Sequence, residues 1–179
     1  MNIGKIIAVI GMCGSGKTEA VKYFLDKGYN KVYFGQAVID ELKKRGLEIN
    51  EVNERKVRED LRKEFGMGVM ALKSIDRIKE YSDKGNVVIE SLYSWDEYKI
   101  IKEVFGDRFK LTTIYTTKSL RYERLRKRPF RQLSFDEAES RDISELENLD
   151  KGGPIAFADY LIINDSTIED MYTKLEKLY

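Results

Sequence analysis

The stretch "IIAVIGMCGSGKT" (residues 6–18) constrains the fold of this chain more than any other segment. A continuous apolar run gives way at Gly11 to a loop that holds three glycines and ends in Lys17 and Thr18. Such a run predicts a strand covered on both faces, which is typical of parallel sheets. The residues that follow predict a helix beginning near Lys17. A strand, a bare loop and a helix therefore follow one another directly.

The loop "GMCGSGKT" (11–18) has the spacing G-x-x-x-x-G-K-[ST] of a phosphate-binding loop. Its glycines let successive N–H groups turn toward phosphate oxygens, and the helix adds its positive end. The ammonium of Lys17 can reach the β- and γ-phosphates, and the Thr18 hydroxyl can bind Mg²⁺. We expect the whole loop to bind nucleotide phosphate: Gly11, Met12, Cys13, Gly14, Ser15, Gly16, Lys17 and Thr18. The alternative is a glycine-rich turn that matches by chance.

Five β-rich runs alternate with helical patterns, which predicts an α/β fold with a parallel sheet. The runs cover residues 5–10, 31–35, 86–92, 111–116 and 159–164. Capping-box patterns predict helix starts at Ser94, Ser134 and Ser166, each with a glutamate three residues later. Residues 36–85 predict three helices, and "KGGP" (151–154) predicts a turn. We expect one domain, residues 1–179, with two helical insertions.

Composition excludes several classes of protein. Lysine plus arginine (32) nearly equal aspartate plus glutamate (31), so net charge gives no reason to expect nucleic acid or an anionic membrane as a partner. Histidine is absent, which excludes histidine bases and histidine-ligated metals. One cysteine and no long apolar run suit a cytoplasmic protein without a membrane span.

Glu90 ends a predicted buried strand, where a carboxylate needs a cationic partner. Mg²⁺ beside the phosphate loop would supply one, and Glu90 could also polarise an attacking hydroxyl. The alternative is a structural ion pair with a lysine.

The segment "KSLRYERLRKRPFR" (118–131) places Arg121, Arg124 and Arg128 three and four residues apart, so we expect them on one helix face. Guanidinium groups there could close over transferring phosphates, with Arg124 and Arg128 the stronger candidates. Arg141 could add another cation. The alternative is a solvated helix paired with the acidic residues at 136–147.

Other candidates lie on the acceptor side and at the last strand. Arg58 and Arg62 share a face of a predicted helix and would suit an acceptor that carries phosphate, although a surface helix with internal pairs explains much of the pattern. Gln36 follows the second strand and could meet the acceptor. Asn164 ends the fifth strand, at the edge where open α/β sheets bind ligands, and could border a base or belong to a plain turn.

Taken together, these segments resemble the nucleotide-kinase branch of P-loop proteins, in particular the adenylate-kinase-related, dephospho-CoA-kinase-like group. The resemblance runs nearly end to end and is most specific in "ESRDISELENLDKGGPIAFADYLIINDST" (139–167). It implies a three-layer P-loop NTPase fold with a five-stranded parallel sheet of order 2-3-1-4-5. It also implies a helical acceptor-binding insertion at 36–80, a lid at 118–150, and ATP and Mg²⁺ as donor and metal.

Two departures from that group concern the acceptor side. Related sequences usually have aspartate, glycine and arginine where this chain has Glu90, Ser91, Leu92 and Tyr93, and Gln36 replaces a frequent acidic residue. The first hypothesis is a kinase acting on a small nucleotide-like acceptor, a nucleoside monophosphate or dephospho-CoA, as a monomer or homodimer. The second is an ATP-binding switch or interaction protein with slow hydrolysis.

Overall fold

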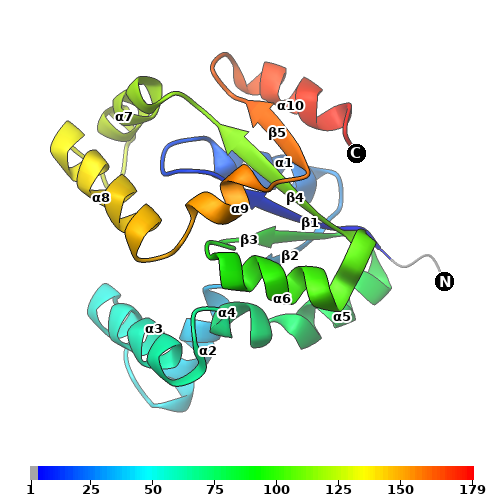
Figure 1. Ribbon diagram of the computed structural model, residues 1–179, viewed down its shortest axis with the longest axis vertical. Helices are drawn as coiled ribbons and strands as arrows, with labels where there is room; N and C mark the ends of the chain where they lie inside the picture. Colours follow the sequence, from blue (N-terminus) through cyan, green and yellow to red (C-terminus); the bar gives the residue numbers. More distant parts are fainter. Residues whose placement is uncertain (1–3) are drawn as a thin grey trace.

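A five-stranded parallel sheet forms the centre of the molecule in the computed structural model, which describes residues 4–179 (Figure 1). The strand order is β2-β3-β1-β4-β5, as expected from the sequence. The strands are β1 (Ile6–Ile10), β2 (Asn30–Tyr33), β3 (Val87–Glu90), β4 (Phe109–Tyr115) and β5 (Tyr160–Ile163). All five predicted strands are therefore confirmed, within two residues at most ends. The chain has the P-loop NTPase kinase fold.

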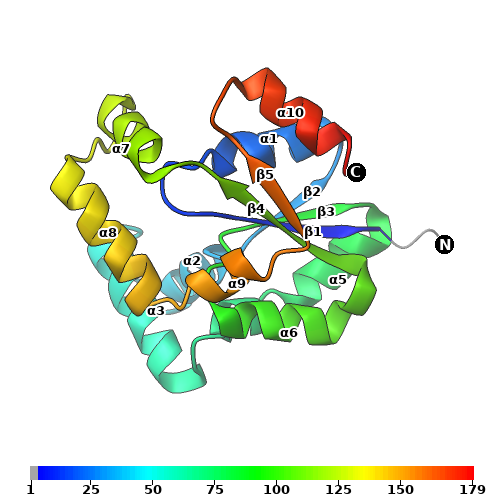
Figure 2. The same ribbon diagram turned by 45° about the horizontal axis from the view of Figure 1, so that its top comes forward.

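Helices cover both faces of the sheet. They are α1 (Lys17–Asp26), α2 (Gln36–Lys44), α3 (Glu51–Phe65), α4 (Val69–Leu72), α5 (Ile75–Lys84), α6 (Trp95–Phe105), η1 (Gly106–Arg108), α7 (Lys118–Lys127), α8 (Phe135–Glu147), α9 (Gly152–Ala156) and α10 (Ile168–Glu176). Helices α1 and α10 pack on one face, and α5 and α6 pack on the other (Figures 1 and 2). None of the helices within residues 4–179 is long and apolar enough to cross a membrane.

The apolar core lies on both sides of the sheet because alternate residues of each strand face opposite layers. In β1, Ile6 and Ala8 join the cluster under α5 and α6, whereas Ile7 and Val9 join the cluster under α1 and α10. All residues of β1 are buried, which explains its unbroken apolar sequence. The central strand thus delivers the glycine loop from a rigid position.

Three predictions about local structure need correction. The helix after β5 is capped by Thr167, which accepts a bond from the Asp170 N–H, because Ser166 is bonded to the Asp170 carboxylate instead. Residues 36–85 hold four helices, since the single-turn α4 precedes α5. The segment "KGGP" opens α9 rather than forming only a turn. The capping boxes at Ser94 and Ser134 are confirmed.

The two helical insertions lie beyond the carboxyl ends of the strands. Of the expected insertion at 36–80, helices α2 and α3 lie there, whereas α5 packs on the sheet. Of the expected lid at 118–150, helices α7 and α8 lie there (Figures 1 and 2). The loop after β1 runs toward the same end of the sheet, so both insertions are placed to meet a ligand held there.

Candidate functional site

The loop from Gly11 to Gly16 has the backbone that its glycines predict. Gly11 and Gly16 have φ angles of 152° and 100°, in the region that favours glycine. A Cβ atom at Gly16 would lie 2.3 Å from the side-chain nitrogen of Asn164, and one at Gly11 would lie 2.3 Å from the Ile114 carbonyl oxygen. The loop therefore excludes side chains at these positions on two grounds, conformation and space.

Main-chain donors of the loop are free to bind an anion. The Ser15 N–H donates to the Met12 carbonyl at 3.2 Å, and the Ala20 N–H donates to the Gly16 carbonyl at 3.1 Å. Within residues 4–179, no acceptor pairs with the N–H groups of Cys13, Gly14, Gly16, Lys17 or Thr18. Helix α1 begins at Lys17, so its positive end points at the same place. The arrangement fits a polyphosphate.

The Ser15 carbonyl is fixed by two buried side chains that directly follow the neighbouring strands β4 and β5. Thr116 Oγ1 donates to it at 3.1 Å, and Asn164 Nδ2 donates to it at 2.8 Å. The Thr116 hydroxyl has one proton, which it shares between the Ser15 carbonyl and the Asn164 carbonyl, the latter at 2.9 Å. The Asn164 side chain therefore holds the backbone of the phosphate loop through the Ser15 carbonyl. The sequence predicts only that Asn164 borders a base or belongs to a turn, so this contact was not expected.

Arg121 is a structural residue rather than part of an exposed cationic stripe. Its guanidinium forms a bidentate ion pair with Asp142 of α8, with Nη1 2.9 Å from Oδ1 and Nη2 2.6 Å from Oδ2, and both side chains are buried. The same guanidinium donates to the Cys13 carbonyl at 2.9 Å. Arg121 thus joins α7, α8 and the phosphate loop. Sequence spacing could not identify this pair, because Asp142 lies 21 residues away.

Lys17 lies in a strongly charged environment. Its ammonium donates to the Met12 carbonyl at 2.9 Å. The pKa of Lys17 is lowered to about 7, first by burial and then by the nearby ammonium of Lys151, while the carboxylate of Glu145 opposes the shift. A bound anion would favour the charged form of Lys17. Lys151 and Glu145 were missed by sequence reasoning, since nothing distinguishes them among 32 basic and 31 acidic residues.

Glu90 forms an ion pair with Lys31 of β2 at 3.1 Å, which is the structural alternative raised by the sequence. The pair is partly exposed, so an incoming cation could compete for the carboxylate. Thr18 is exposed in the first turn of α1. In the part of the chain described, no group of three or more cysteine, aspartate or glutamate side chains could hold a metal ion. These residues still fit Mg²⁺, which commonly keeps several waters and binds substrate phosphates with few protein ligands.

The other predicted lid arginines do not form one stripe. Arg124 donates to Thr116 Oγ1 at 3.3 Å, which places it beside the phosphate loop support. Arg128 follows the end of α7 and donates to the Arg131 carbonyl, so it leaves the helix face that spacing predicted. Arg141 is exposed on α8 and donates to Glu145 at 3.3 Å. Arg124 thus contacts Thr116, which bonds to the phosphate loop, and Arg141 contacts Glu145, whose charge affects the pKa of Lys17.

On the acceptor side, Arg62 is the most constrained candidate. It is half-buried, its Nε atom is buried without a partner among residues 4–179, and burial lowers its pKa, opposed by Glu97. Arg58 is also half-buried on the same helix. Gln36 donates to Asp40 at 2.8 Å at the start of α2. The Arg62 guanidinium thus keeps a donor that an anion could accept from.

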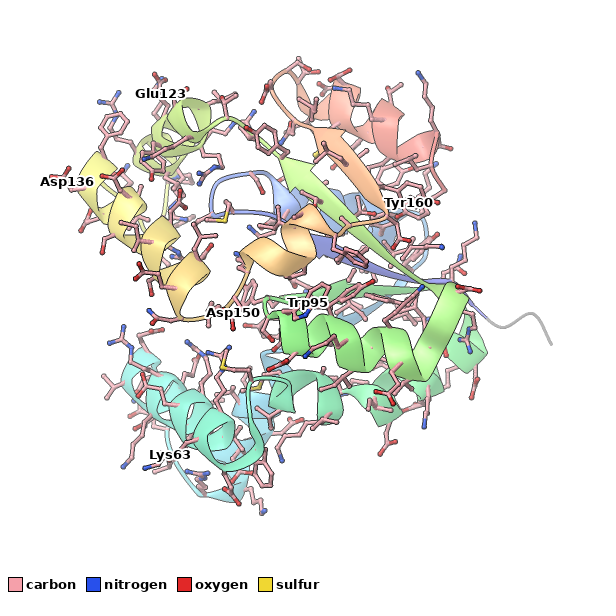
Figure 3. The ribbon with its side chains drawn as sticks, in the orientation of Figure 1. Lys63, Trp95, Glu123, Asp136, Asp150 and Tyr160 are labelled. Carbon is pink, nitrogen blue, oxygen red and sulfur yellow. The ribbon has the colours of Figure 1, made fainter. Side chains whose placement is uncertain are left out.

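A cavity of about 540 Å³ lies between the start of α6 and the segment joining α8 to α9. Trp95 and Phe157 provide aromatic walls, and Asp96 and Asp150 provide carboxylates. Trp95 stacks on Tyr98 with ring centroids 5.0 Å apart, which holds the indole in place. Figure 3 labels Trp95 at the start of α6 and Asp150 in the segment between α8 and α9, near one another. The volume suits a small molecule.

Comparison with known proteins gives the family and agrees with the fold. A family model described as an AAA domain matches residues 7–144. A UPF0200 protein of Thermococcus onnurineus is 36% identical over 97% of this chain and 95% of its own length. A UPF0200 protein of Thermococcus kodakarensis is 34% identical over 97% of this chain and 95% of its own length.

Solved structures show the same fold at low sequence identity. A shikimate kinase from Acinetobacter baumannii superposes with a TM-score of 0.63 at 17% identity, over 99% of this chain and 93% of that one. A dephospho-CoA kinase from Campylobacter jejuni superposes with a TM-score of 0.54 at 16% identity, over 98% of this chain and 96% of that one. With a domain match over most of its length and relatives aligned nearly end to end, this chain belongs to the AAA domain family and to the UPF0200 proteins.

Proposed function

We propose that this protein is an ATP- and Mg²⁺-dependent phosphotransferase that moves the γ-phosphoryl group to a small nucleotide-like acceptor. The observation that carries the proposal is the loop at 11–18. Among the residues that the structure describes, no group pairs with its N–H groups at Cys13, Gly14, Gly16, Lys17 and Thr18, and the ammonium of Lys17 lies beside them. The two insertions at the same end of the sheet supply surfaces for an acceptor and for a lid.

The chain's own residues bind and orient rather than react covalently. The loop amides and the ammonium of Lys17 hold the donor phosphates, and the hydroxyl of Thr18 and the carboxylate of Glu90 would hold Mg²⁺. When bound, Mg²⁺ neutralises charge on the phosphate oxygens. Arg124, Arg128 and Arg141 on the lid side would stabilise charge that builds up during transfer. Closure of the insertions would exclude water.

The acceptor is proposed to lie between α3 and the loop after β3. Arg58 and Arg62 are the cationic groups there, and Gln36 stands at the start of α2. A nucleoside monophosphate and dephospho-CoA both carry a phosphate for these arginines. The kinases of similar fold are named for shikimate and for dephospho-CoA, so the fold alone leaves the acceptor open.

A screen of acceptors tests the proposal directly. Nucleoside monophosphates and dephospho-CoA are incubated with ATP or GTP, Mg²⁺ and the protein, and formation of ADP or GDP is measured. We expect multiple turnovers that depend on one acceptor, and loss of turnover in the Lys17→Ala variant. Turnover that persists in Lys17→Ala would come from another site or a contaminant and would refute the proposal.

A nucleotide-dependent switch is the second candidate, favoured by the ion pair between Glu90 and Lys31. A Glu90 held by Lys31 is less available to polarise an acceptor hydroxyl. Slow release of ADP that no acceptor accelerates would support this candidate over the kinase.

Arg62 provides a prediction about the acceptor site. Arg62→Ala should raise the KM for the acceptor at least about tenfold, with little change in the KM for ATP, because a charged contact to phosphate is lost. Arg58→Ala should act in the same direction. Arg55→Ala, an exposed arginine on the same helix, is the matched control and should leave both constants unchanged. An unchanged acceptor KM in the Arg58 and Arg62 variants would remove these residues from the site.

A further inference from the structure

A buried lysine stands at the junction of α8 and α9, outside the motif that carries the proposed function. Lys151 is only 1% exposed. Its ammonium donates to Glu145 Oε2 at 2.7 Å and lies 4.6 Å from the centre of the Tyr93 ring. Burying an ammonium is costly, so these partners account for how it is tolerated but not for why it is there.

Both oxygens of the Glu145 carboxylate are engaged by cations. Lys151 binds Oε2, and Arg141 Nε donates to Oε1 at 3.3 Å. Glu145 lies three residues after Asp142 on the same face of α8, and Arg121 joins that face to the Cys13 carbonyl of the phosphate loop. The charge of Glu145 accordingly favours the charged form of Lys17. Nevertheless, within residues 4–179 Lys17 forms no ion pair, and its hydrogen bond goes to the neutral Met12 carbonyl.

A Glu145 carboxylate without its own partner would compete with phosphate for the Lys17 ammonium. A free carboxylate beside a partly buried ammonium forms a strong ion pair, and that pair must break before a phosphate can bind. Since Lys151 occupies Oε2 of Glu145, the carboxylate is held in α8 and the Lys17 ammonium stays available.

We propose that Lys151 is a positioning residue that keeps the Glu145 carboxylate away from Lys17 and so keeps Lys17 free for nucleotide phosphate. This proposal rests on the phosphate site of the proposed function. Two other roles make different predictions. A lysine that contacts phosphate directly would be needed whether or not Glu145 is charged, and a lysine that only anchors α9 would affect folding without affecting nucleotide affinity.

The test is calorimetric titration of ATP with Mg²⁺ into four purified full-length proteins. They are wild type, Lys151→Met, Lys151→Arg and the double variant Lys151→Met/Glu145→Gln. We expect Lys151→Met to weaken binding by about tenfold or more, because Glu145 then pairs with Lys17. Lys151→Arg should stay within about threefold of wild type, since it can still bind the carboxylate. The double variant should return to within about threefold of wild type, because no carboxylate remains to compete.

Each other result overturns the positioning role. Wild-type affinity in Lys151→Met would show that Glu145 needs no restraint. Equal weakening in Lys151→Met and in the double variant would assign Lys151 a direct contact with phosphate. If Lys151→Met does not fold, the double variant decides alone, since it removes both buried charges together: affinity more than about tenfold below wild type refutes the proposal. If wild type itself binds no nucleotide, the proposed function fails, which is a separate outcome.

Discussion

The buried ion pair between Arg121 and Asp142 allows a quantitative prediction. The Asp142→Asn substitution keeps the shape of the side chain and removes its charge. Arg121, 5% exposed, would then remain buried beside the phosphate loop without a counter-charge. Breaking a buried pair of this kind costs about 3–5 kcal/mol, and asparagine keeps one acceptor oxygen, so we expect about 3 kcal/mol. For a chain of this length that corresponds to a fall in Tm of roughly 6–12 °C.

The assay is thermal unfolding followed by circular dichroism at pH 7. Glu80→Gln is the control, because it removes an exposed pair with Lys84 on one helix and should leave Tm unchanged. The double variant Arg121→Met/Asp142→Leu should recover most of the lost Tm, since it leaves no unpaired charge buried between α7 and α8. It should still bind ATP more weakly than wild type, because the Cys13 carbonyl loses its donor. A fall of less than about 2 °C in Asp142→Asn would refute the account of the pair.

Two further predictions concern buried polar side chains. The pKa of Glu97 is raised from 4.5 to about 7, mainly by burial, so the folded protein binds this proton more tightly than the unfolded chain does. The stability that this proton contributes is therefore present at low pH and is lost as the pH rises from about 4.5 to 7. The Tm of wild type relative to Glu97→Gln should therefore be higher at pH 5 than at pH 8, and parallel Tm curves would contradict the assignment. Asn164→Ala removes the bond to the Ser15 carbonyl and should weaken ATP binding by about three- to tenfold in calorimetry, whereas Asp165→Ala, an exposed neighbour, should not; equal affinities in all three proteins would show that the loop needs no support from β5.

Local signals in the sequence explain why so much of the fold could be predicted. The continuous apolar strand before Gly11 and the serine–glutamate boxes at Ser94 and Ser134 depend on residues within a few positions of one another. The strand order came from resemblance to a known family, since spacing alone does not specify it. The misplaced cap at Ser166 shows the limit of such patterns, because Thr167 has the same chemistry one residue later.

Contacts between distant segments explain what the sequence did not reveal. The spacing predicts Arg121 on one cationic helix face with Arg124 and Arg128, but Asp142 and the Cys13 carbonyl hold its guanidinium in the interior. Lys151 and Glu145 become visible only when the end of α8 is brought beside the phosphate loop. The ion pair of Arg121 and Asp142 joins residues 21 positions apart. Lys151 and Glu145 are only six positions apart, but their effect on Lys17 depends on a much more distant segment.

Titration of ATP and Mg²⁺ into the wild-type protein and the Lys17→Met variant tests the phosphate site most directly. We expect heat of binding at one site per chain in wild type and an affinity at least about tenfold weaker in Lys17→Met, with both proteins folded by circular dichroism. Absence of binding heat and of any thermal shift in wild type, with GTP as well as ATP, would show that residues 11–18 do not hold a nucleoside triphosphate.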